Sequence, residues 1–304
     1  ASVPETLRQV IERQVERLSS TEQQVLAVAS VVGVEFSAAA VAAGLQASVE
    51  EIDQRCAILA RQEQFITAHG TEAWPDGTLS ERYSFRHALY HAALYDRLTE
   101  TQRVRLHRRI AERKELAYGE RAGDIAAELA GHFESGREPW KAVRYLQLAG
   151  ENAMRRYANQ EAISYFTKEL SFLNALPDSP QSWSQELSLH VALGPALIAT
   201  QGYASQEVVS TYLRARELCL RIGDEARLFP VLYGLWSFYI THAEPNPTRE
   251  LGEQLLVLAR RHNDPALLLQ AHRALAETFF WLGDFSAGRE HGHRRCRRRP
   301  AQHQ

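Results

Sequence analysis

Metal-binding residue types gather near the end of the chain. The four candidates there are His291, His293, Cys296 and His303. Imidazole nitrogens and thiolates are usual ligands of Zn²⁺. Five arginines lie between positions 294 and 299, however, and their positive charge repels a cation. We therefore expect no metal site in this chain.

Motifs of the common enzyme classes are absent from the sequence. There is no Gly-x-Ser-x-Gly elbow, no His-Glu-x-x-His pair and no pair of carboxylates that suggests acid–base catalysis. The Gly-x4-Gly-Lys-Ser/Thr and Gly-x-Gly-x-x-Gly loops, which cradle nucleotide phosphates, are missing too. We expect that this chain is not an enzyme, has no catalytic residue and holds no cofactor by itself.

Two further clusters have the composition of binding surfaces. A basic run on a predicted helix is read either as a solvated face or as a docking face for an acidic partner; its members are Arg103, Arg105, His107, Arg108, Arg109 and Arg113. We expect most of an aromatic-rich set to be core between stacked helices and a minority to line a groove; this set is Trp236, Phe238, Tyr239, Phe279, Phe280 and Trp281.

Charge and cysteine content narrow the class of protein. The 304 residues carry a formal net charge of −2, but positions 285–304 hold six arginines and one glutamate, so the rest of the chain is mildly acidic. This balance disfavours a general nucleic-acid or membrane-surface binder. The three cysteines, Cys56, Cys219 and Cys296, are far apart and fit no disulfide spacing. The longest charge-free stretch near the middle, positions 228–240, is too short for a membrane helix, which needs ~20 residues. We expect a cytoplasmic protein.

Helical periodicity dominates the elements that must position these residues. Apolar residues at helical spacing and capping signals predict four helices in the first part, over positions 4–18, 20–32, 37–44 and 48–62. Gly33 and Gly44 are expected to end the second and third of these. Two short β-like runs follow at positions 65–68 and 82–85, with a predicted loop over 69–80 between them. Helices followed by a hairpin with a long tip are the order of a winged helix.

From position 87 onward the sequence predicts helices over 87–98 and 100–118, then helices of 14–20 residues with short breaks. The breaks are expected at positions 136–139, 158–159, 177–180, 202–205, 223–224, 245–247, 264–265 and 283–284. This regular pairing suggests tetratricopeptide-like repeats.

Small residues twelve positions apart support the repeat interpretation. Ala130 and Ala142 have this spacing, as do Gly150 and Ala162, and Phe166 follows four positions later. Small residues let the two helices of a hairpin approach closely, while the large ones cover the next hairpin. We predict an all-α fold with a small β-wing: a winged-helix module over residues 1–100, then a tetratricopeptide-like solenoid over 101–304 whose last ~20 residues are disordered or atypical.

Two segments carry a resemblance to a known family. The winged-helix region that follows the ATPase core of STAND-class signalling ATPases is similar to VPETLRQVIERQVERLSSTEQQVLAVASVVGVEFSAAAVAAGL and to YSFRHALYHAALYDRL. The nearest group is that of large bacterial proteins that join an adenylate/guanylate cyclase or DNA-binding domain to such an ATPase and a tetratricopeptide array. The resemblance extends over essentially the whole chain, and it is specific only in the winged-helix part.

The resemblance implies a nucleotide contact. In STAND proteins a histidine at the start of the helix after the wing touches the phosphate of the bound nucleotide, and Phe85-Arg86-His87 stands at this place. His87 and Arg86 are therefore candidate contacts for ATP or ADP bound to an ATPase core that this sequence lacks. The alternative is a helix-start histidine bonded only to the backbone. Because the sequence begins with Ala1 and has Met154 as its only methionine, we expect a piece of a longer protein.

The end of the chain departs from the repeat pattern. The pattern predicts small, aromatic and small residues at three positions that hold Gly288, Gly292 and Arg295. The Arg-rich tail is read as a basic interaction arm, as the altered end of a cut or mistranslated reading frame, or as a frayed capping helix.

Together these observations predict a regulatory, protein-interaction segment of a STAND-type ATPase. Its repeats would sense a protein partner or a small effector, and its winged helix would relay this to its own ATPase core. Two alternatives concern the parent protein: an adenylate/guanylate cyclase or ATPase, or a transcriptional regulator. Binding of DNA through the module itself is disfavoured, because the predicted third helix of the winged helix has a net charge of −1 and phosphate contact requires basic residues. We expect neither a nucleic-acid nor a membrane partner.

Overall fold

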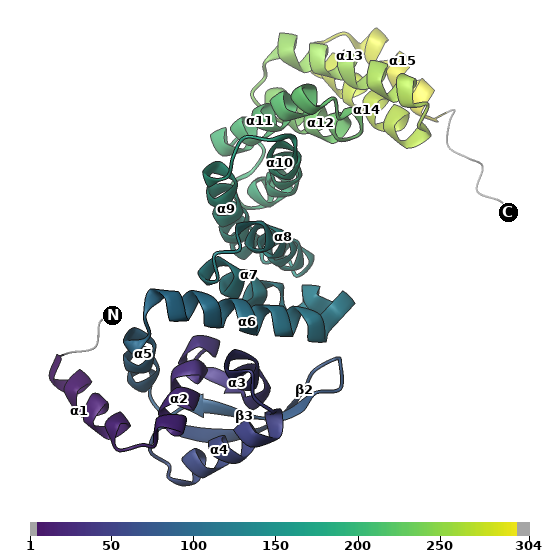
Figure 1. The fold of residues 1–304 in the computed structure, drawn as a ribbon. Helices are drawn as coiled ribbons and strands as arrows, with labels where there is room; N and C mark the ends of the chain where they lie inside the picture. The colour runs from purple at the N-terminus through teal and green to yellow at the C-terminus, as the bar shows by residue number, and fades with distance from the viewer. Residues whose placement is uncertain (1–4, 297–304) are drawn as a thin grey trace. The chain divides into compact units, whose positions relative to one another are not determined.

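The computed structural model describes residues 5–296, and the side chains of residues 10–293 (Figure 1). The fold is mostly helical with one small sheet, and stacked helix pairs follow, which confirms the predicted fold class. The chain divides into two compact units, the N-terminal unit Ala1–Ala149 and the C-terminal unit Gly150–Gln304. The expected module boundary near residue 100 stays a prediction.

The N-terminal unit begins with a winged helix and continues with three more helices. Its elements are α1 (Glu5–Glu16), α2 (Ser20–Val32), β1 (Glu35–Ser37), α3 (Ala38–Leu45), α4 (Val49–Arg61), β2 (Ile66–Ala73), β3 (Leu79–Phe85), α5 (Ala88–Arg97), α6 (Glu100–Tyr118), the 3-10 helix η1 (Gly119–Ile125) and α7 (Ala126–Ser135). Helix α8 (Pro139–Arg155) leads into the C-terminal unit. Strand β1 and η1 were not predicted, because three and seven residues give too short a pattern to read.

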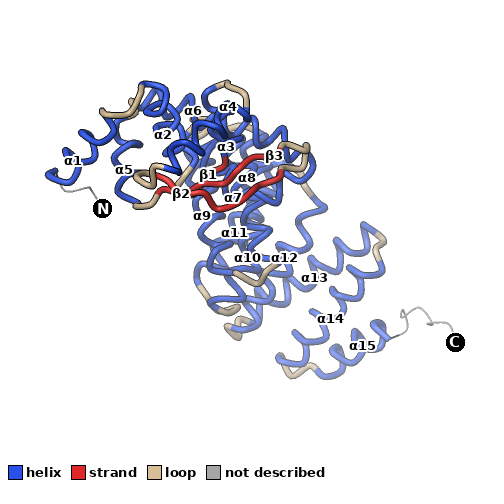
Figure 2. The backbone as a smooth tube through the Cα atoms, turned by 90° about the horizontal axis from the view of Figure 1, so that it is seen from below, coloured by secondary structure: helices blue, strands red, loops and turns tan. Residues whose placement is uncertain are grey.

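The three strands form one antiparallel sheet in the order β1-β3-β2 (Figure 2). Phe36 of β1 pairs with Tyr83 of β3, and their rings stack with centroids 5.8 Å apart. Phe85 packs against the same Phe36 ring at 5.4 Å. These rings join the buried faces of α2, α3 and α4 in one apolar core. Burial of alternate strand residues therefore fixes how the hairpin sits against the helices.

The wing is a tight hairpin, so the long loop predicted at its tip is wrong. Strand β2 runs to Ala73, β3 starts at Leu79, and an irregularity between Ala68 and Thr71 interrupts their pairing. The turn is closed by a hydrogen bond of 2.8 Å from the Trp74 amide to the Thr78 carbonyl. Polar and glycine residues suggested a loop here, but they lie on extended strands that are joined by a short turn.

Gly44 does not end its helix, as was expected, but lies inside it. Helix α3 continues to Leu45, and Gln46 in the left-handed conformation is its cap (φ 57°). A Cβ at Gly44 would lie 2.5 Å from Cγ1 of Val28 on α2. The glycine therefore serves close packing of two helices. Gly33, in contrast, caps α2 as predicted.

The C-terminal unit consists of helices that pack against their neighbours in sequence. These are α9 (Asn159–Ala175), α10 (Pro180–Gln201), α11 (Gln206–Ile222), α12 (Glu225–Thr241), α13 (Pro245–His262), α14 (Pro265–Trp281) and α15 (Phe285–Cys296). The predicted breaks between them are confirmed except at 245–247. Pro245 and Pro247 lie in the first turn of α13, where a missing N–H does no harm, and the break is at 242–244.

Glycine–ring contacts bring the helices of this unit together. A Cβ at Gly150 would overlap the Phe166 ring, so the predicted small-residue position is confirmed. The Tyr212 ring of α11 lies against Gly194 of α10 and Gly234 of α12, and a Cβ at either glycine would overlap it. One ring is thus held between the backbones of two helices.

The last helix fits the repeat pattern at its start. A Cβ at Gly288 would lie 3.3 Å from the carbonyl oxygen of Ala276, so the predicted small residue lies at a close helix approach. The arginines of the tail at 297–299 lie outside the described residues, and so do the side chains of Arg294, Arg295 and Cys296. Among the described helices, none combines the length and the apolar character that crossing a bilayer requires.

Candidate functional site

Arg86 and His87 join the wing to α5, as the sequence predicted for the end of the hairpin. The Arg86 amide donates to the Phe65 carbonyl at 2.9 Å, which closes the base of the hairpin. His87 is the N-cap of α5, and its Nδ1 accepts a long hydrogen bond of 3.5 Å from the Leu89 amide. The other ring nitrogen then carries the proton and is a hydrogen-bond donor. Both side chains are exposed.

The two side chains differ in how firmly they are held. The Arg86 guanidinium donates to the Glu63 carbonyl oxygen and forms an ion pair of 3.8 Å with the Glu63 carboxylate. His87 caps its own helix, which is the alternative that the sequence left open. Capping leaves Nε2–H to contact a further group, so this geometry is compatible with both interpretations.

The wing tip is bound to α6 within the N-terminal unit. Arg113 of α6 forms an ion pair of 2.8 Å with Asp76 and donates to the Thr78 hydroxyl at 2.8 Å. The Arg113 guanidinium also lies 5.0 Å from the centre of the Trp74 ring. Figure 1 shows the β2–β3 hairpin reaching towards α6, so this contact, which we call the wing clamp (Trp74, Asp76, Thr78 and Arg113), links the two.

Several side chains of the basic run on α6 have partners within the N-terminal unit, while Arg105 and Arg108 are exposed. Arg108 pairs with Glu138 at 2.7 Å, Arg109 donates to the Gly44 carbonyl at 3.3 Å, and Arg103 donates to the Tyr95 carbonyl at 3.1 Å. These side chains hold the winged helix, α6 and the start of α8 together. The run is thus a partly solvated face with internal partners, and docking of an acidic partner stays a prediction.

A buried histidine pair lies between α6 and α7. Nδ1 of His107 and Nδ1 of His132 are 2.8 Å apart, and Nε2 of His107 is 3.1 Å from the Tyr95 hydroxyl. The pKa of both histidines is lowered to about 4, chiefly by burial and, for His132, also by the charge of the neighbouring Lys114. Both rings are therefore neutral at pH 7. The residues are 25 positions apart, and no sequence signal pointed to this pair.

Helix α4 presents an acidic and apolar face where a DNA-binding winged helix would present a basic one. Glu50, Glu51 and Gln54 are exposed, and Arg55 is engaged by Glu51 at 2.8 Å. Ile58 is exposed to 50%. Such a face offers little to phosphates.

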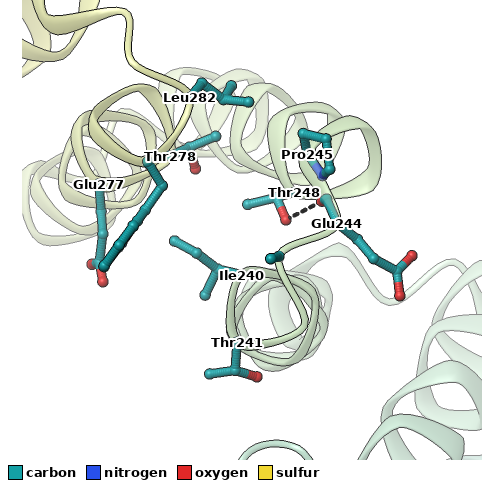
Figure 3. A pocket seen from close by; sticks show the side chains of 10 residues that line it. Ile240, Thr241, Glu244, Pro245, Thr248, Glu277, Thr278 and Leu282 are labelled. Atoms are coloured by element: carbon teal, nitrogen blue, oxygen red, sulfur yellow. Dashed lines mark hydrogen bonds between the residues drawn. The ribbon is translucent and has the colours of Figure 1, made fainter.

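An open pocket of about 670 Å³ lies in the C-terminal unit between the end of α12, the start of α13 and the end of α14 (Figure 3). We call it the α12–α14 pocket. Its apolar lining consists of Ile240, Ala243, Pro245, Trp281 and Leu282. The volume lies in the range of ~300–1,000 Å³ that is typical of ligand sites.

The polar lining of the α12–α14 pocket contains two carboxylates and three hydroxyls and no basic side chain. These residues are Thr241, Glu244, Thr248, Glu277 and Thr278. In Figure 3, Ile240, Thr248 and Thr278 lie around the middle, with Glu277 on the left and Glu244 on the right. The pocket thus has apolar and hydroxyl side chains around its middle and a glutamate on either side.

Aromatic rings continue from the pocket onto the surface. Trp281 is 71% exposed, Phe280 57% and Phe285 61%, and Phe280 meets each of the other two rings edge-on at 5.7 Å. Of the aromatic set singled out from the sequence, Trp236 and Phe238 are buried, Tyr239 and Phe279 are half-buried, and Phe280 and Trp281 are exposed, so the expectation that most of the set is core is wrong. Trp281 lines the α12–α14 pocket. We call Phe280, Trp281 and Phe285 the α14–α15 aromatic surface.

The suggested metal ligands are only partly described. Nδ1 of His291 lies 2.9 Å from Nδ1 of His272 on α14. Within the described part of the chain, no three histidine, cysteine or acidic residues are grouped so that they could hold a metal ion. Cys296 and His303 lie outside the described side chains.

Comparisons with known proteins find similar chains among curated proteins and among solved structures. The chain matches no protein-family model. An uncharacterized protein of Rhizobium meliloti (strain 1021) is 27% identical over 209 residues, which are 68% of this chain and 20% of that protein. The chain therefore spans about a fifth of the length of this curated relative.

Among solved structures, BtubC of P. vanneervenii is similar over 67% of this chain and 92% of its own, with a TM-score of 0.49 and 17% identity. A Signal Transduction ATPase with Numerous Domains protein with a tetratricopeptide repeat sensor, from Pyrococcus horikoshii, is similar over 98% of this chain and 53% of its own, with a TM-score of 0.46 and 12% identity.

Proposed function

We propose that the chain is a regulatory, protein-interaction segment of a STAND-type signalling ATPase, without enzyme activity of its own. The observation that carries the interaction part is the α12–α14 pocket beside the α14–α15 aromatic surface. Exposed apolar patches next to a concave pocket are typical of binding sites. The assignment to a STAND-type protein rests on the sequence resemblance around Phe85-Arg86-His87.

In this proposal the repeats bind a partner and the winged helix passes the effect to an ATPase core outside the sequence. The wing clamp supports such a relay, because it ties the wing to α6 and so to the helices that follow. His87 and Arg86 contact the phosphate of ATP or ADP held by that core. The acidic face of α4 supports a regulatory role over DNA binding.

Selection of displayed peptides tests the interaction part. A phage library of random 12-residue peptides is selected on the full chain, and the enriched clones are then tested on Trp281→Ala. Trp281 is mostly exposed, so its removal should leave the fold intact. Tyr157→Ala, at a ring that is 89% exposed elsewhere in the same unit, is the matched control. We expect clones that lose binding to Trp281→Ala and keep binding to Tyr157→Ala. Clones that bind the unchanged chain, Trp281→Ala and Tyr157→Ala equally well would show that the pocket is not the binding surface.

Equilibrium dialysis with labelled ATP tests the nucleotide part. The chain alone should bind no ATP at micromolar concentrations, since the phosphate-cradling loop is absent. Micromolar affinity for ATP would contradict the proposal that His87 and Arg86 act only together with a separate core.

A further inference from the structure

The polar groups of the α12–α14 pocket are almost all hydrogen-bond acceptors. The hydroxyl of Thr248 donates to the Glu244 carbonyl at 2.6 Å, and that of Thr278 donates to the Ala274 carbonyl at 2.8 Å. The Thr241 hydroxyl donates to the Phe238 carbonyl at 2.7 Å. Each hydroxyl has a single proton, so none is left to donate to a ligand. The Thr278 hydroxyl also accepts a hydrogen bond of 2.9 Å from the Trp236 indole, so most of the acceptor capacity that a ligand can use belongs to the two carboxylates.

The backbone around the pocket adds no donors. The amides of Ala243, Glu244 and Thr248 donate to carbonyls of their own helix ends, and so does the amide of Leu282. Pro245 has no N–H to offer. Apart from the Trp281 indole, the lining thus presents acceptors to whatever enters.

Charge favours the same kind of ligand. Glu244 and Glu277 lie at two sides of the pocket, and no lysine or arginine is part of its lining (Figure 3). Helices α12 and α14 both end at the pocket, and helix C-termini carry a negative partial charge. Of the three helices that line it, α13 begins there, so negative helix ends outnumber positive ones. The face of the exposed Trp281 ring is a further attraction for a cation.

We infer that the α12–α14 pocket binds a basic peptide segment of a protein partner, with an arginine or lysine side chain in the pocket and apolar residues on the α14–α15 aromatic surface. This inference rests on the proposed function and adds the chemistry of the partner. A guanidinium has five N–H donors and no acceptor, which complements an acceptor-rich lining. Its apolar stem matches Ile240 and Leu282. The exposed rings next to the pocket favour a peptide over a free amine, because only a peptide covers both.

The test uses two synthetic nonapeptides and the full chain. One peptide alternates leucine with arginine, and the other replaces each arginine by citrulline, which has the same shape without the charge. Binding is followed by nuclear magnetic resonance through the indole N–H signal of Trp281, which is assigned by its loss in Trp281→Phe. We expect the arginine peptide to shift this signal and to bind at least tenfold more tightly than the citrulline peptide.

Variants that neutralise glutamates show which carboxylates bind the arginine peptide. Glu244→Gln combined with Glu277→Gln should weaken the arginine peptide at least fivefold. Glu250→Gln combined with Glu253→Gln removes two exposed charges from α13 outside the pocket, and it should change the affinity less than twofold. Thermal unfolding of both double variants checks that the fold is kept.

Three outcomes would overturn the inference. Equal affinity for the two peptides would mean that the pocket does not recognise the positive charge. An equal loss of affinity in both double variants would mean that only the overall charge of the protein matters. No shift of the Trp281 signal with either peptide would place the binding elsewhere. The selection of displayed peptides tells failure of this inference from failure of the proposed function. Selected clones that have no basic residues and still need Trp281 for binding would contradict the inference and support the proposed function.

Discussion

In the N-terminal unit Arg113 reaches from α6 to the wing tip, and Lys114 next to it is buried and paired with Glu128. In the C-terminal unit Glu244 and Glu277 lie at a pocket whose lining holds no basic side chain. These two basic side chains are thus paired internally, whereas the pocket of the C-terminal unit has two carboxylates and no basic residue in its lining. In the proposed function, the N-terminal unit relays an effect and the C-terminal unit binds the partner.

Two kinds of contact between helices, one example from each unit, can be compared. Polar networks through His107, His132 and Arg108 join the helices of the N-terminal unit. In the C-terminal unit, glycines let the Tyr212 ring approach the backbones of α10 and α12. Substitutions at Tyr212 should therefore be sensitive to side-chain volume, and those at His107 and His132 to pH.

The largest effect is expected at Tyr212. Its ring is 6% exposed and lies against Gly194 and Gly234, so Tyr212→Ala should lower the free energy of unfolding by about 3–5 kcal/mol, as for other buried aromatic residues. Gly234→Ala alone should lower it by about 1–3 kcal/mol through overpacking. Urea unfolding of the single and double variants measures the coupling.

In the Tyr212→Ala background, Gly234→Ala should become neutral or stabilising, because the overlap is gone and a small cavity is filled. Additive losses in the double variant would contradict the packing role of Tyr212. Such a result would also remove the contrast with the N-terminal unit.

The second effect is acid sensitivity of the N-terminal unit. Burial holds the pKa of His107 and His132 at about 4 in the folded state, against 6.5 in the unfolded state. Between these values the unfolded chain binds more protons at these two residues, so their contribution to stability is full above pH 6.5 and is lost as the pH is lowered towards 4. In this pH range each histidine lowers the free energy of unfolding by about 1.4 kcal/mol for each unit by which the pH falls.

Urea unfolding at pH 7 and pH 5 measures this loss, and we expect a contribution of about 3–4 kcal/mol from the pair. The double variant His107→Asn, His132→Asn keeps polar atoms near the two Nδ1 positions and should abolish most of the difference between the two pH values. A variant that is as sensitive to acid as the parent would contradict the neutral, buried pair.

Much of the fold followed from local patterns, and the missing parts depend on tertiary contacts. Helix α6 has the predicted bounds Glu100–Tyr118, because its caps and apolar spacing are local signals. The His107–His132 pair depends on how α6 packs on α7, and the α12–α14 pocket depends on how the repeats stack. The wing tip was read as a long loop because nothing in the sequence shows that Arg113 fixes it.

The candidate site residues were predicted with unequal success. The sequence placed His87 at the start of a helix, and it caps α5. Its role towards a nucleotide, and that of Arg86, stay predictions. Trp281 was identified as a member of an aromatic set, but Glu244 and Glu277 were not, since single glutamates on helices carry no local signal of a pocket.

The third effect lies in the C-terminal unit, where one carboxyl lowers the free energy of unfolding as the pH rises, opposite to the histidine pair. Glu169 of α9 is fully buried, and burial raises the pKa of its carboxyl to about 8, with the charge of Glu151 adding to the shift. Gln185 donates to one carboxyl oxygen at 3.1 Å. The folded state keeps a proton on Glu169 that the unfolded state loses above pH 4.5. The contribution of Glu169 to the free energy of unfolding therefore falls as the pH rises from 4.5 to 8.

Glu169→Gln imitates the protonated form, so it should raise the free energy of unfolding by about 1–3 kcal/mol at pH 8 and change it little at pH 5. Urea unfolding at both pH values measures this. Glu161→Gln, on the same helix but exposed, is the control and should have no such pH-dependent effect. Destabilisation by Glu169→Gln at pH 8 would mean that the carboxyl is ionised in the folded protein.

The smallest effect is expected at the wing clamp. Arg113→Ala removes the ion pair with Asp76, the hydrogen bond to Thr78 and the contact with the Trp74 ring. Because the ion pair is about one-third exposed, we expect a loss of only about 1 kcal/mol in the free energy of unfolding. Hydrogen exchange at residues 74–78 should accelerate much more than exchange in the sheet. Arg105→Ala, at an exposed position of the same helix, should change neither quantity. If exchange at the wing tip stayed slow in Arg113→Ala, the wing would be held by its own turn, and α6 could not transmit a change to it.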